Sequence, residues 1–249
     1  MTLPIIVAHR GNSNYFVENS FEAIFTAIHN KVEYIEIDLR QTKDGQIIIS
    51  HDNSLRRIFK KKGVISSLTH KEILDLCSDG TEVLTLDYII KLLNGKTKFF
   101  FEIKNTCNEF LVLKKLEELN CKDYIIGSFF IEKLKNIRKQ NRFVNLCHMS
   151  LIPKLDLISD FKKYNIKYVS IGDSFLFTKK THQKYVDNNI KDIVFTINSL
   201  KKCNKYIKFG VFGITTDIPF EIADHYKKLN ADSLLINNLK PQKKIITKN

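Results

Sequence analysis

The fold of this chain is decided by one stretch, YIEIDLRQTKDGQIIISHD, at residues 34–52. Two β-type runs in it, at about 33–39 and 46–50, flank Asp44-Gly45, the strongest short turn signal in the sequence. The second run begins only about eight residues after Asp38, whereas a parallel crossover needs roughly a dozen or more. We therefore expect an antiparallel return that brings His51 back beside Glu36 and Asp38.

Outside this hairpin, β-type runs alternate with helical stretches of about ten to fifteen residues, a pattern typical of repeated βα units and a parallel sheet. The other expected strands lie near residues 5–8, 98–103, 124–129, 144–149, 167–172, 192–197 and 210–215. With the return run set aside, the strands number eight, the count that closes a (β/α)8 barrel. We expect this α/β TIM barrel rather than an open doubly wound sheet.

Residues 52–98 separate two consecutive segments that place polar side chains at strand ends, His51-Asp52 and Glu102-Ile103-Lys104. No other two consecutive segments of this kind are as far apart. They include a helix expected to begin at Thr69 and a second at about residues 85–94, which together predict a small helical insertion over the site. No linker rich in Gly, Pro or Ser and no second core is evident. We therefore expect one barrel domain over residues 1–249, in which Asn19 and Glu22 form a capping box for the first helix.

The chain has 249 residues, 43% of them hydrophobic, and this is enough for one large core. Its formal net charge of +13 would attract anions, although the basic residues are scattered and reflect a general bias toward Lys. Two basic runs, at residues 56–62 and 240–248, remain candidates for contact with a polyanion. Because no nucleic-acid-binding motif is present, we expect no nucleic-acid partner.

The chain has five cysteines, which are widely spaced and include no pair at metal-ligand spacing, so a disulfide framework and a zinc ribbon are not expected. The first eight residues lack the features of a secretory signal, and no apolar run approaches the roughly 20 residues that span a bilayer. These features predict a reduced, cytoplasmic protein without stable membrane insertion. They leave its oligomeric state open.

Three carboxylates are the candidate metal ligands. Glu36 and Asp38 are two residues apart on an expected strand, so both side chains leave the same face. Glu102 lies at the matching end of the next barrel strand. Such hard oxygen ligands favour Mg²⁺ or Ca²⁺ over zinc.

The alternative is that these acids are charges at the barrel rim paired with Arg10, Arg40 and Lys104. Three carboxylates directed into a barrel would repel one another unless a cation neutralised them. We therefore expect one divalent cation at this position.

His9 and His51 are the candidates for proton transfer, because imidazole titrates near neutrality and both residues follow strands beside the carboxylates. Arg10 offers a bidentate fork for phosphate oxygens, and Lys104 points to the same face as Glu102. Either cation could instead only balance the nearby acids. The phenylalanines at 99–101 and 129–130 are expected to belong to the barrel core rather than to a ligand platform.

The chain resembles the glycerophosphodiester phosphodiesterase family, which has a phospholipase C-like phosphodiesterase barrel. The resemblance rests on Ala8-His9-Arg10-Gly11, Glu18-Asn19-Ser20, Glu36-Ile37-Asp38, Thr42-Lys43-Asp44-Gly45, His51-Asp52 and Glu102-Ile103-Lys104, in this order. It implies metal ligands at Glu36, Asp38 and Glu102, acid and base roles for His9 and His51, and phosphate binding by Arg10 and Lys104. Val17 and Phe195 depart from the proline and tryptophan usual in the family.

The residues and the resemblance together predict metal-dependent hydrolysis of a glycerophosphodiester to sn-glycerol 3-phosphate and an alcohol, with two-histidine acid/base catalysis. The expected partner is therefore a small-molecule substrate. One alternative keeps the site but takes a lysophospholipid, with its acyl chain on an apolar surface of the insertion. Another is a catalytically silent barrel that binds phosphodiesters. The sequence decides neither the preferred alcohol, nor the metal, nor which histidine acts first as acid.

Overall fold

The computed structural model describes residues 3–29 and 32–239, so the basic run at 240–248 lies outside the described residues. Parallel strands close into a barrel because β1 pairs with β9 on one side and with β2 on the other. The barrel strands are β1 (Ile5–Ala8), β2 (Tyr34–Gln41), β4 (Lys98–Ile103), β5 (Tyr124–Ser128), β6 (Asn145–Ser150), β7 (Tyr168–Gly172), β8 (Lys191–Phe195) and β9 (Gly213–Thr216). The predicted eight-stranded parallel barrel is confirmed.

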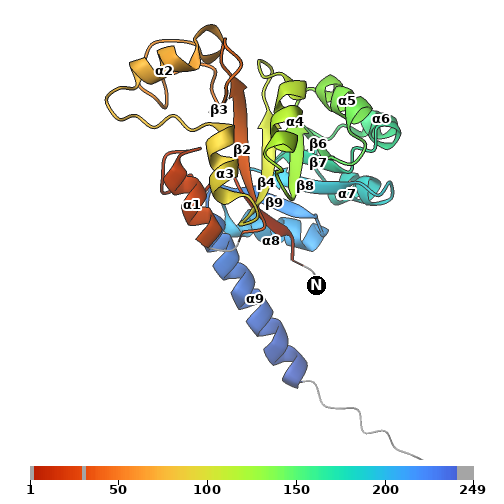
Figure 1. The fold of residues 1–249 in the computed structure, drawn as a ribbon. Coiled ribbons are helices and arrows are strands. Elements are labelled where there is room, and N and C mark those ends of the chain that lie inside the picture. The colour runs from red at the N-terminus through yellow and green to blue at the C-terminus, as the bar shows by residue number, and fades with distance from the viewer. Residues whose placement is uncertain (1–2, 30–31, 240–249) are drawn as a thin grey trace, which may run out of the picture.

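The antiparallel return is confirmed as well. Strand β3 (Ile47–Ile49) pairs with the end of β2, with Leu39 opposite Ile49 and Gln41 opposite Ile47. Gly45 supplies the left-handed backbone that the turn needs, at φ 89°. β2 therefore extends beyond the rim of the barrel before the chain turns back toward it (Figure 1).

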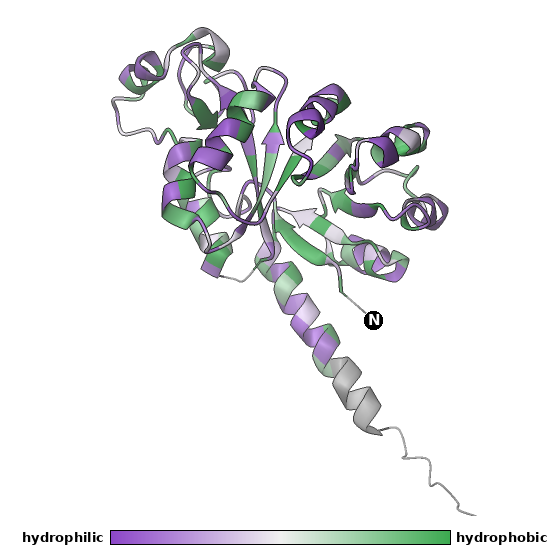
Figure 2. Cartoon of the chain, turned by 45° about the vertical axis from the view of Figure 1, so that its right-hand side comes forward, coloured by the Kyte–Doolittle hydropathy of each residue, from purple (hydrophilic) through white to green (hydrophobic). Residues whose placement is uncertain are grey.

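Helices surround the barrel, and the strands between them are largely apolar (Figures 1 and 2). The helices that follow barrel strands are α1 (Phe21–His29), α4 (Glu109–Glu118), α5 (Ile131–Gln140), α6 (Ile158–Lys163), α7 (Lys179–Val186), α8 (Leu200–Phe209) and α9 (Pro219–Leu239), with a 3₁₀ turn, η2 (Leu155–Leu157), before α6. A large apolar core lies between sheet and helices, and a smaller one inside the barrel includes Val7, Phe100 and Ile193. Among residues 3–29 and 32–239, no helix combines the length and apolar character needed to cross a bilayer.

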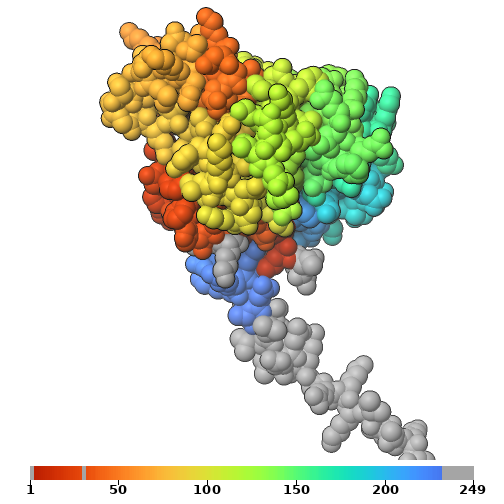
Figure 3. Space-filling view, viewed as in Figure 1, coloured from red at the N-terminus to blue at the C-terminus, as the bar shows by residue number. Residues whose placement is uncertain are grey.

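The predicted helical insertion separates β3 from β4 and contains η1 (Ile65–Ser67), α2 (His70–Leu76) and α3 (Leu86–Leu93). Thr69 and Glu72 form the expected capping box of α2. The first part of the insertion rises as a lobe above the end of the barrel (Figure 3). Contrary to expectation, this lobe has a small core of its own, in which Leu55, Phe59 and Ile73 pack with Ile48 of β3.

The predicted capping box of Asn19 with Glu22 is wrong. The side chain of Asn19 is buried and donates from Nδ2 to Asp38 Oδ2 at 2.8 Å, so it faces the barrel and not the helix. Ser20 takes part of the capping role, because its hydroxyl accepts the backbone N–H of Ala23 at 3.2 Å. Tertiary contact with a buried acid has overridden the local capping signal.

Gly11 is the tightest point at the site end of β1. Its φ is 82°, and a Cβ there would lie 2.4 Å from the carbonyl carbon of Ala23. We predict that Gly11→Ala lowers the free energy of unfolding by at least about 2 kcal/mol, because backbone strain adds to a clash with a helix backbone. Gly80→Ala is the matched control, since Gly80 has φ 89° and nothing within 4 Å of the added Cβ. Measured by urea unfolding, Gly80→Ala should lower the free energy of unfolding by about 1 kcal/mol. Equal losses for the two variants would contradict a clash at Gly11.

Candidate active site

The predicted site residues converge on one cavity at the carboxyl ends of the barrel strands. The cavity has a volume of about 190 Å³, and its lining includes His9, Arg10, Glu36, His51, Glu102 and Lys104. Asp38 is fully buried behind this lining and contacts the side chains of Arg10 and Lys104. Parallel strands have brought together residues that are up to 95 positions apart in the sequence (9 to 104).

The three carboxylates form one buried cluster. Glu36, Asp38 and Glu102 are 2%, 0% and 5% exposed, and one oxygen of each lies within 4.8 Å of the others. The register of the sheet explains this, because Asp38 of β2 lies opposite Glu102 of β4, and Glu36 shares the face of Asp38. This geometry is compatible with an ion held by all three.

Two cations balance part of this negative charge. Lys104 Nζ lies 2.7 Å from Asp38 Oδ1 and 2.5 Å from Glu102 Oε1, and Arg10 Nε lies 3.1 Å from Asp38 Oδ2. Arg40, the third cation of the ion-pair alternative, instead donates to the carbonyl oxygen of His51 at 2.6 and 3.0 Å. The ion-pair interpretation is therefore correct for Arg10 and Lys104 but not for Arg40.

Two cations for three acids leave the cluster short of positive charge. Burial, together with Asp38 and Glu102, raises the pKa of Glu36 well above its ordinary value, and burial and Asp38 raise the pKa of Glu102 to about 7. Despite burial, Lys104 and Arg10 lower the pKa of Asp38. Glu36 Oε2 accepts the backbone N–H of Arg10, but its buried Oε1 has no hydrogen-bond partner. Buried carboxylates with an unpartnered oxygen are a donor set that fits a hard divalent cation.

Each histidine at the cavity is held by a carboxylate. His9 Nδ1 lies 2.6 Å from Asp217 Oδ1, and His51 Nδ1 lies 2.8 Å from Asp52 Oδ1. The hydrogen bond from Arg57 is the main cause that lowers the pKa of Asp52 to about 2. Burial of Asp217 opposes ionisation, but the hydrogen bond and charge of His9 and the hydrogen bonds of Asn198 and Ser13 together lower its pKa to about 2. Ionised carboxylates only accept, so each imidazole carries its proton on Nδ1 and leaves Nε2 for other partners.

Asn19 and Asp217 are polar residues of this site that reasoning from the sequence did not place in it: Asn19 was expected to cap the first helix, and Asp217 was given no role. Asn19 holds Asp38 through both its amide nitrogen and its oxygen. Asp217 also accepts from Ser13 Oγ at 2.9 Å and from Asn198 Nδ2 at 2.5 Å. Asn19 lies in the Glu18-Asn19-Ser20 segment of the family pattern, but Asp38 is 19 residues from Asn19 and His9 is 208 residues from Asp217, so no local signal predicts either contact.

The prediction that the phenylalanines at 129–130 belong to the core is wrong. Phe99, Phe100 and Phe101 are buried, whereas Phe129 is 37% exposed and lines the site cavity. Phe129 meets Phe195 edge to face, with ring centroids 6.1 Å apart. The residue that departs from the usual tryptophan of the family therefore forms part of an aromatic wall of the cavity.

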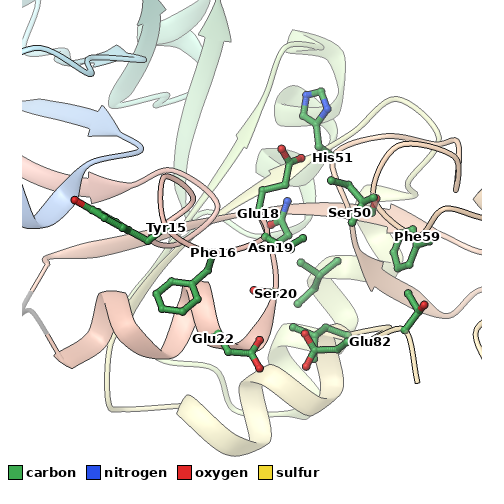
Figure 4. Close-up of a pocket in the computed structure, with 15 residues that line it drawn as sticks. Tyr15, Phe16, Glu18, Asn19, Ser20, Glu22, Ser50, His51, Phe59 and Glu82 are labelled. Atoms are coloured by element: carbon green, nitrogen blue, oxygen red, sulfur yellow. The ribbon is translucent and has the colours of Figure 1, made fainter. Parts of the chain in front are cut away.

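A second, larger hollow of about 450 Å³ adjoins the site between residues 15–22 and the insertion (Figure 4). His51 lines both hollows. Phe16, Ile58 and Phe59 contribute apolar surface to the second one, with His51 and Glu18 toward one end. The cluster of Glu36, Asp38 and Glu102 does not line the larger hollow, but His51 connects this hollow to the cavity that two of these acids line.

Comparison with known proteins agrees with this geometry. A family model described as the glycerophosphoryl diester phosphodiesterase family matches residues 9–221. The chain belongs to this family. Both the predicted family and the predicted class of enzyme are thereby confirmed.

The chain is also similar to individual relatives and, in fold, to solved structures. The chain is 26% identical over 237 residues to a glycerophosphodiester phosphodiesterase of Bacillus altitudinis, with 86% of this chain and 94% of the relative covered. A similar relative from Caldanaerobacter subterraneus is 25% identical, with 90% and 98% covered. The fold matches an Oleispira antarctica phosphodiesterase solved in complex with the product sn-glycerol-3-phosphate, at a TM-score of 0.81 and 20% identity, with 90% and 97% covered.

The pair of His9 and Asp217 predicts a pH dependence of stability. Asp217 has a pKa of about 2 in the folded chain against 3.8 ordinarily, so its contribution is present above pH 4 and is lost as the pH falls through 2. We predict that Asp217→Asn costs at most about 2 kcal/mol at pH 6, and that the difference from wild type shrinks at pH 3 and below.

Urea unfolding of both proteins across this pH range measures the difference. Asp75→Asn on the exposed face of α2 is the control and should change stability by less than about 0.5 kcal/mol at each pH. A difference for Asp217→Asn that stayed constant from pH 6 to pH 2 would contradict the depressed pKa.

Proposed function

We propose that this chain hydrolyses glycerophosphodiesters to sn-glycerol 3-phosphate and an alcohol, using one divalent cation and two histidines. The observation that carries the proposal is the cavity itself, in which a buried acidic cluster faces two imidazoles held by carboxylates. The product bound in the Oleispira antarctica structure supports glycerol 3-phosphate as the product here. We take residues 1–249 to act as one domain with a small insertion within 52–98.

Arg10 and Lys104 would hold the phosphodiester. Both line the cavity, and both contact the acidic cluster. Burial alone would lower the pKa of Lys104, but the neighbouring Asp38 and Glu102 raise it, so the ammonium stays charged at neutral pH. Arg10 can present its planar guanidinium to phosphate oxygens.

Glu36, Asp38 and Glu102 would hold the cation, Mg²⁺ or Ca²⁺, whose charge would stabilise negative charge developing on the phosphoryl oxygens. Asn19 and the backbone N–H of Arg10 fix two of these carboxylates by hydrogen bonds. The protein thus holds its acidic oxygens in place before any ligand binds, which reduces the reorganisation that binding requires.

His9 and His51 would move the protons. One imidazole takes the proton of the attacking hydroxyl or water at its Nε2, and the other, protonated, gives a proton to the leaving alcohol. Asp217 and Asp52 keep each ring in the orientation and tautomer that this requires. Burial lowers the pKa of His51, which favours its neutral form at neutral pH.

A lysophospholipid substrate is the second candidate, and the larger hollow beside His51 is the observation that favours it. Its apolar lining from Phe16, Ile58 and Phe59 could accept part of an acyl chain next to the cavity where the phosphate would lie. This candidate predicts that micellar lysophosphatidylcholine is cleaved faster than glycerophosphocholine at equal concentration.

The first test is release of glycerol 3-phosphate from glycerophosphocholine and glycerophosphoethanolamine by the purified protein. We predict that a chelator abolishes release and that added Mg²⁺ or Ca²⁺ restores it, because three buried acids require a cation.

Glu36→Gln should weaken metal binding measured by calorimetry. Cleavage of lysophospholipids alone would favour the second candidate, and no cleavage with any metal would favour a silent phosphodiester-binding barrel.

The two histidines give a separate prediction. His9→Ala and His51→Ala should each lower kcat by at least about 100-fold, because each removes a proton-transfer group. His29→Ala on the exposed end of α1 is the matched control and should leave kcat unchanged. Near-normal turnover in both site variants, with metal bound, would remove the histidines from the mechanism.

A further inference from the structure

Arg57, at the start of the insertion, connects two acids from separate segments of the chain, Glu18 before α1 and Asp52 after β3. Its Nε donates to Asp52 Oδ2 at 2.6 Å. Its two terminal nitrogens donate to the two oxygens of Glu18, at 2.8 and 2.6 Å. One guanidinium therefore makes a bidentate contact with one carboxylate and a single contact with another, a geometry that lysine cannot reproduce.

Each of these acids has a second partner at the cavity. Glu18 Oε1 also accepts from Arg10 Nη1 at 2.9 Å, and Asp52 Oδ1 accepts from His51 Nδ1 at 2.8 Å. The result is a continuous chain of charged contacts in the order Arg10, Glu18, Arg57, Asp52, His51. Its two ends are a proposed phosphate-binding residue and a proposed proton-transfer residue.

The alternating charges of these five side chains stabilise the network of contacts that links them. Glu18 is only 16% exposed at its side chain, although Arg57 itself is 46% exposed. Hydrogen bonding by Arg57 and the charges of Arg10 and Arg57 outweigh burial and lower the pKa of Glu18, and Arg57 is the main cause of the lowered pKa of Asp52. A single exposed ion pair contributes little to stability, but an alternating network with a bidentate member is the exception.

Removal of Arg57 would affect both ends. Glu18 would keep one cation instead of two, and Asp52 would lose its strongest partner and be free to leave His51. Arg10 follows the end of β1, and its side chain is held by Glu18 and Asp38, so a displaced Glu18 would leave it with one of these two contacts. Displacement of a reactive group by about 1 Å can cost on the order of 100-fold in rate.

We propose that Arg57 is a positioning residue, through which the insertion orients Arg10 for the phosphate and His51 for proton transfer. The inference rests on the proposed function. Arg57 itself is not among the residues that line the cavity, so it acts through Glu18 and Asp52 and not on the substrate. The insertion is then a working part of the site and not only a cover beside it.

The test compares Arg57→Ala with Arg56→Ala in the intact chain. Arg56 is its exposed neighbour, and among the described residues its only hydrogen bond is from its backbone N–H to Ser54. With glycerophosphocholine and saturating Mg²⁺, Arg57→Ala should lower kcat at least about 10-fold and raise KM, whereas Arg56→Ala should change neither more than twofold. Arg57→Lys should recover only part of the loss.

Lys115→Ala is the control for the loss of an ion pair that only stabilises the fold. It removes a contact of 2.8 Å to Asp87, and neither residue lines the cavity or the larger hollow. It should cost as much thermal stability as Arg57→Ala without changing kcat. Two single substitutions separate the branches, since Glu18→Gln should act mainly on KM and Asp52→Asn mainly on kcat. Each should be less than additive with Arg57→Ala, because coupled residues share their effect.

Side-chain ¹⁵N NMR of His51 at pH 8 gives a readout independent of turnover. Wild type should show the Nδ1–H tautomer, and Arg57→Ala a mixture of tautomers. Arg57→Ala with wild-type kcat, KM and tautomer would overturn the proposal. Failure of wild type itself to release glycerol 3-phosphate would instead overturn the proposed function, while the tautomer comparison would still decide whether Arg57 positions His51.

Discussion

The buried negative charge at the carboxyl end of the barrel is the constraint on which the rest of the site depends. Glu36, Asp38 and Glu102 are buried, and one oxygen of each lies within 4.8 Å of the others, so the three carboxylates repel one another. Lys104 and Arg10 compensate in part, but burial and the charge of the neighbouring acids still raise the pKa of Glu36 and of Glu102. A divalent cation would complete this balance, so the two basic side chains would become free to turn toward a phosphate.

The hairpin of β2 and β3 supplies a second group of residues to the same place. Because β3 runs antiparallel to the end of β2, the chain returns to the rim and leaves His51 and Asp52 beside the acids. The insertion begins only a few residues later, so Arg57 can reach back across the rim to Glu18. One tight turn thus determines both the position of an imidazole and the point from which the insertion contacts the site.

Structural features that follow from repeating or alternating residue patterns could be predicted from the sequence. Features that depend on contacts between distant residues could not. Strand alternation and Asp44-Gly45 were sufficient for the barrel and its return strand, because both signals are local. Residue types at strand ends were sufficient to predict that the carboxylates and the histidines lie close together, while their roles stay predictions. Asn19 was misassigned because a helix-cap signal and a buried amide look alike in sequence, and the outcome depended on Asp38. Phe129 was misassigned because an aromatic residue after a strand can enter the core or line a cavity, and its contact with Phe195, 66 residues away, has no local signal.

The two imidazoles owe their orientation to two different features of the fold. Asp52 is the sequence neighbour of His51, so the hairpin alone suffices to form that pair. Asp217 lies 208 residues from His9, and it reaches His9 only because β9 pairs with β1, where Ala8 lies opposite Thr216. That pairing is the closure of the barrel. An open sheet with the same strands would leave β1 and β9 on separate edges and His9 without its carboxylate, so the closed barrel is a requirement of this pair and not merely its support.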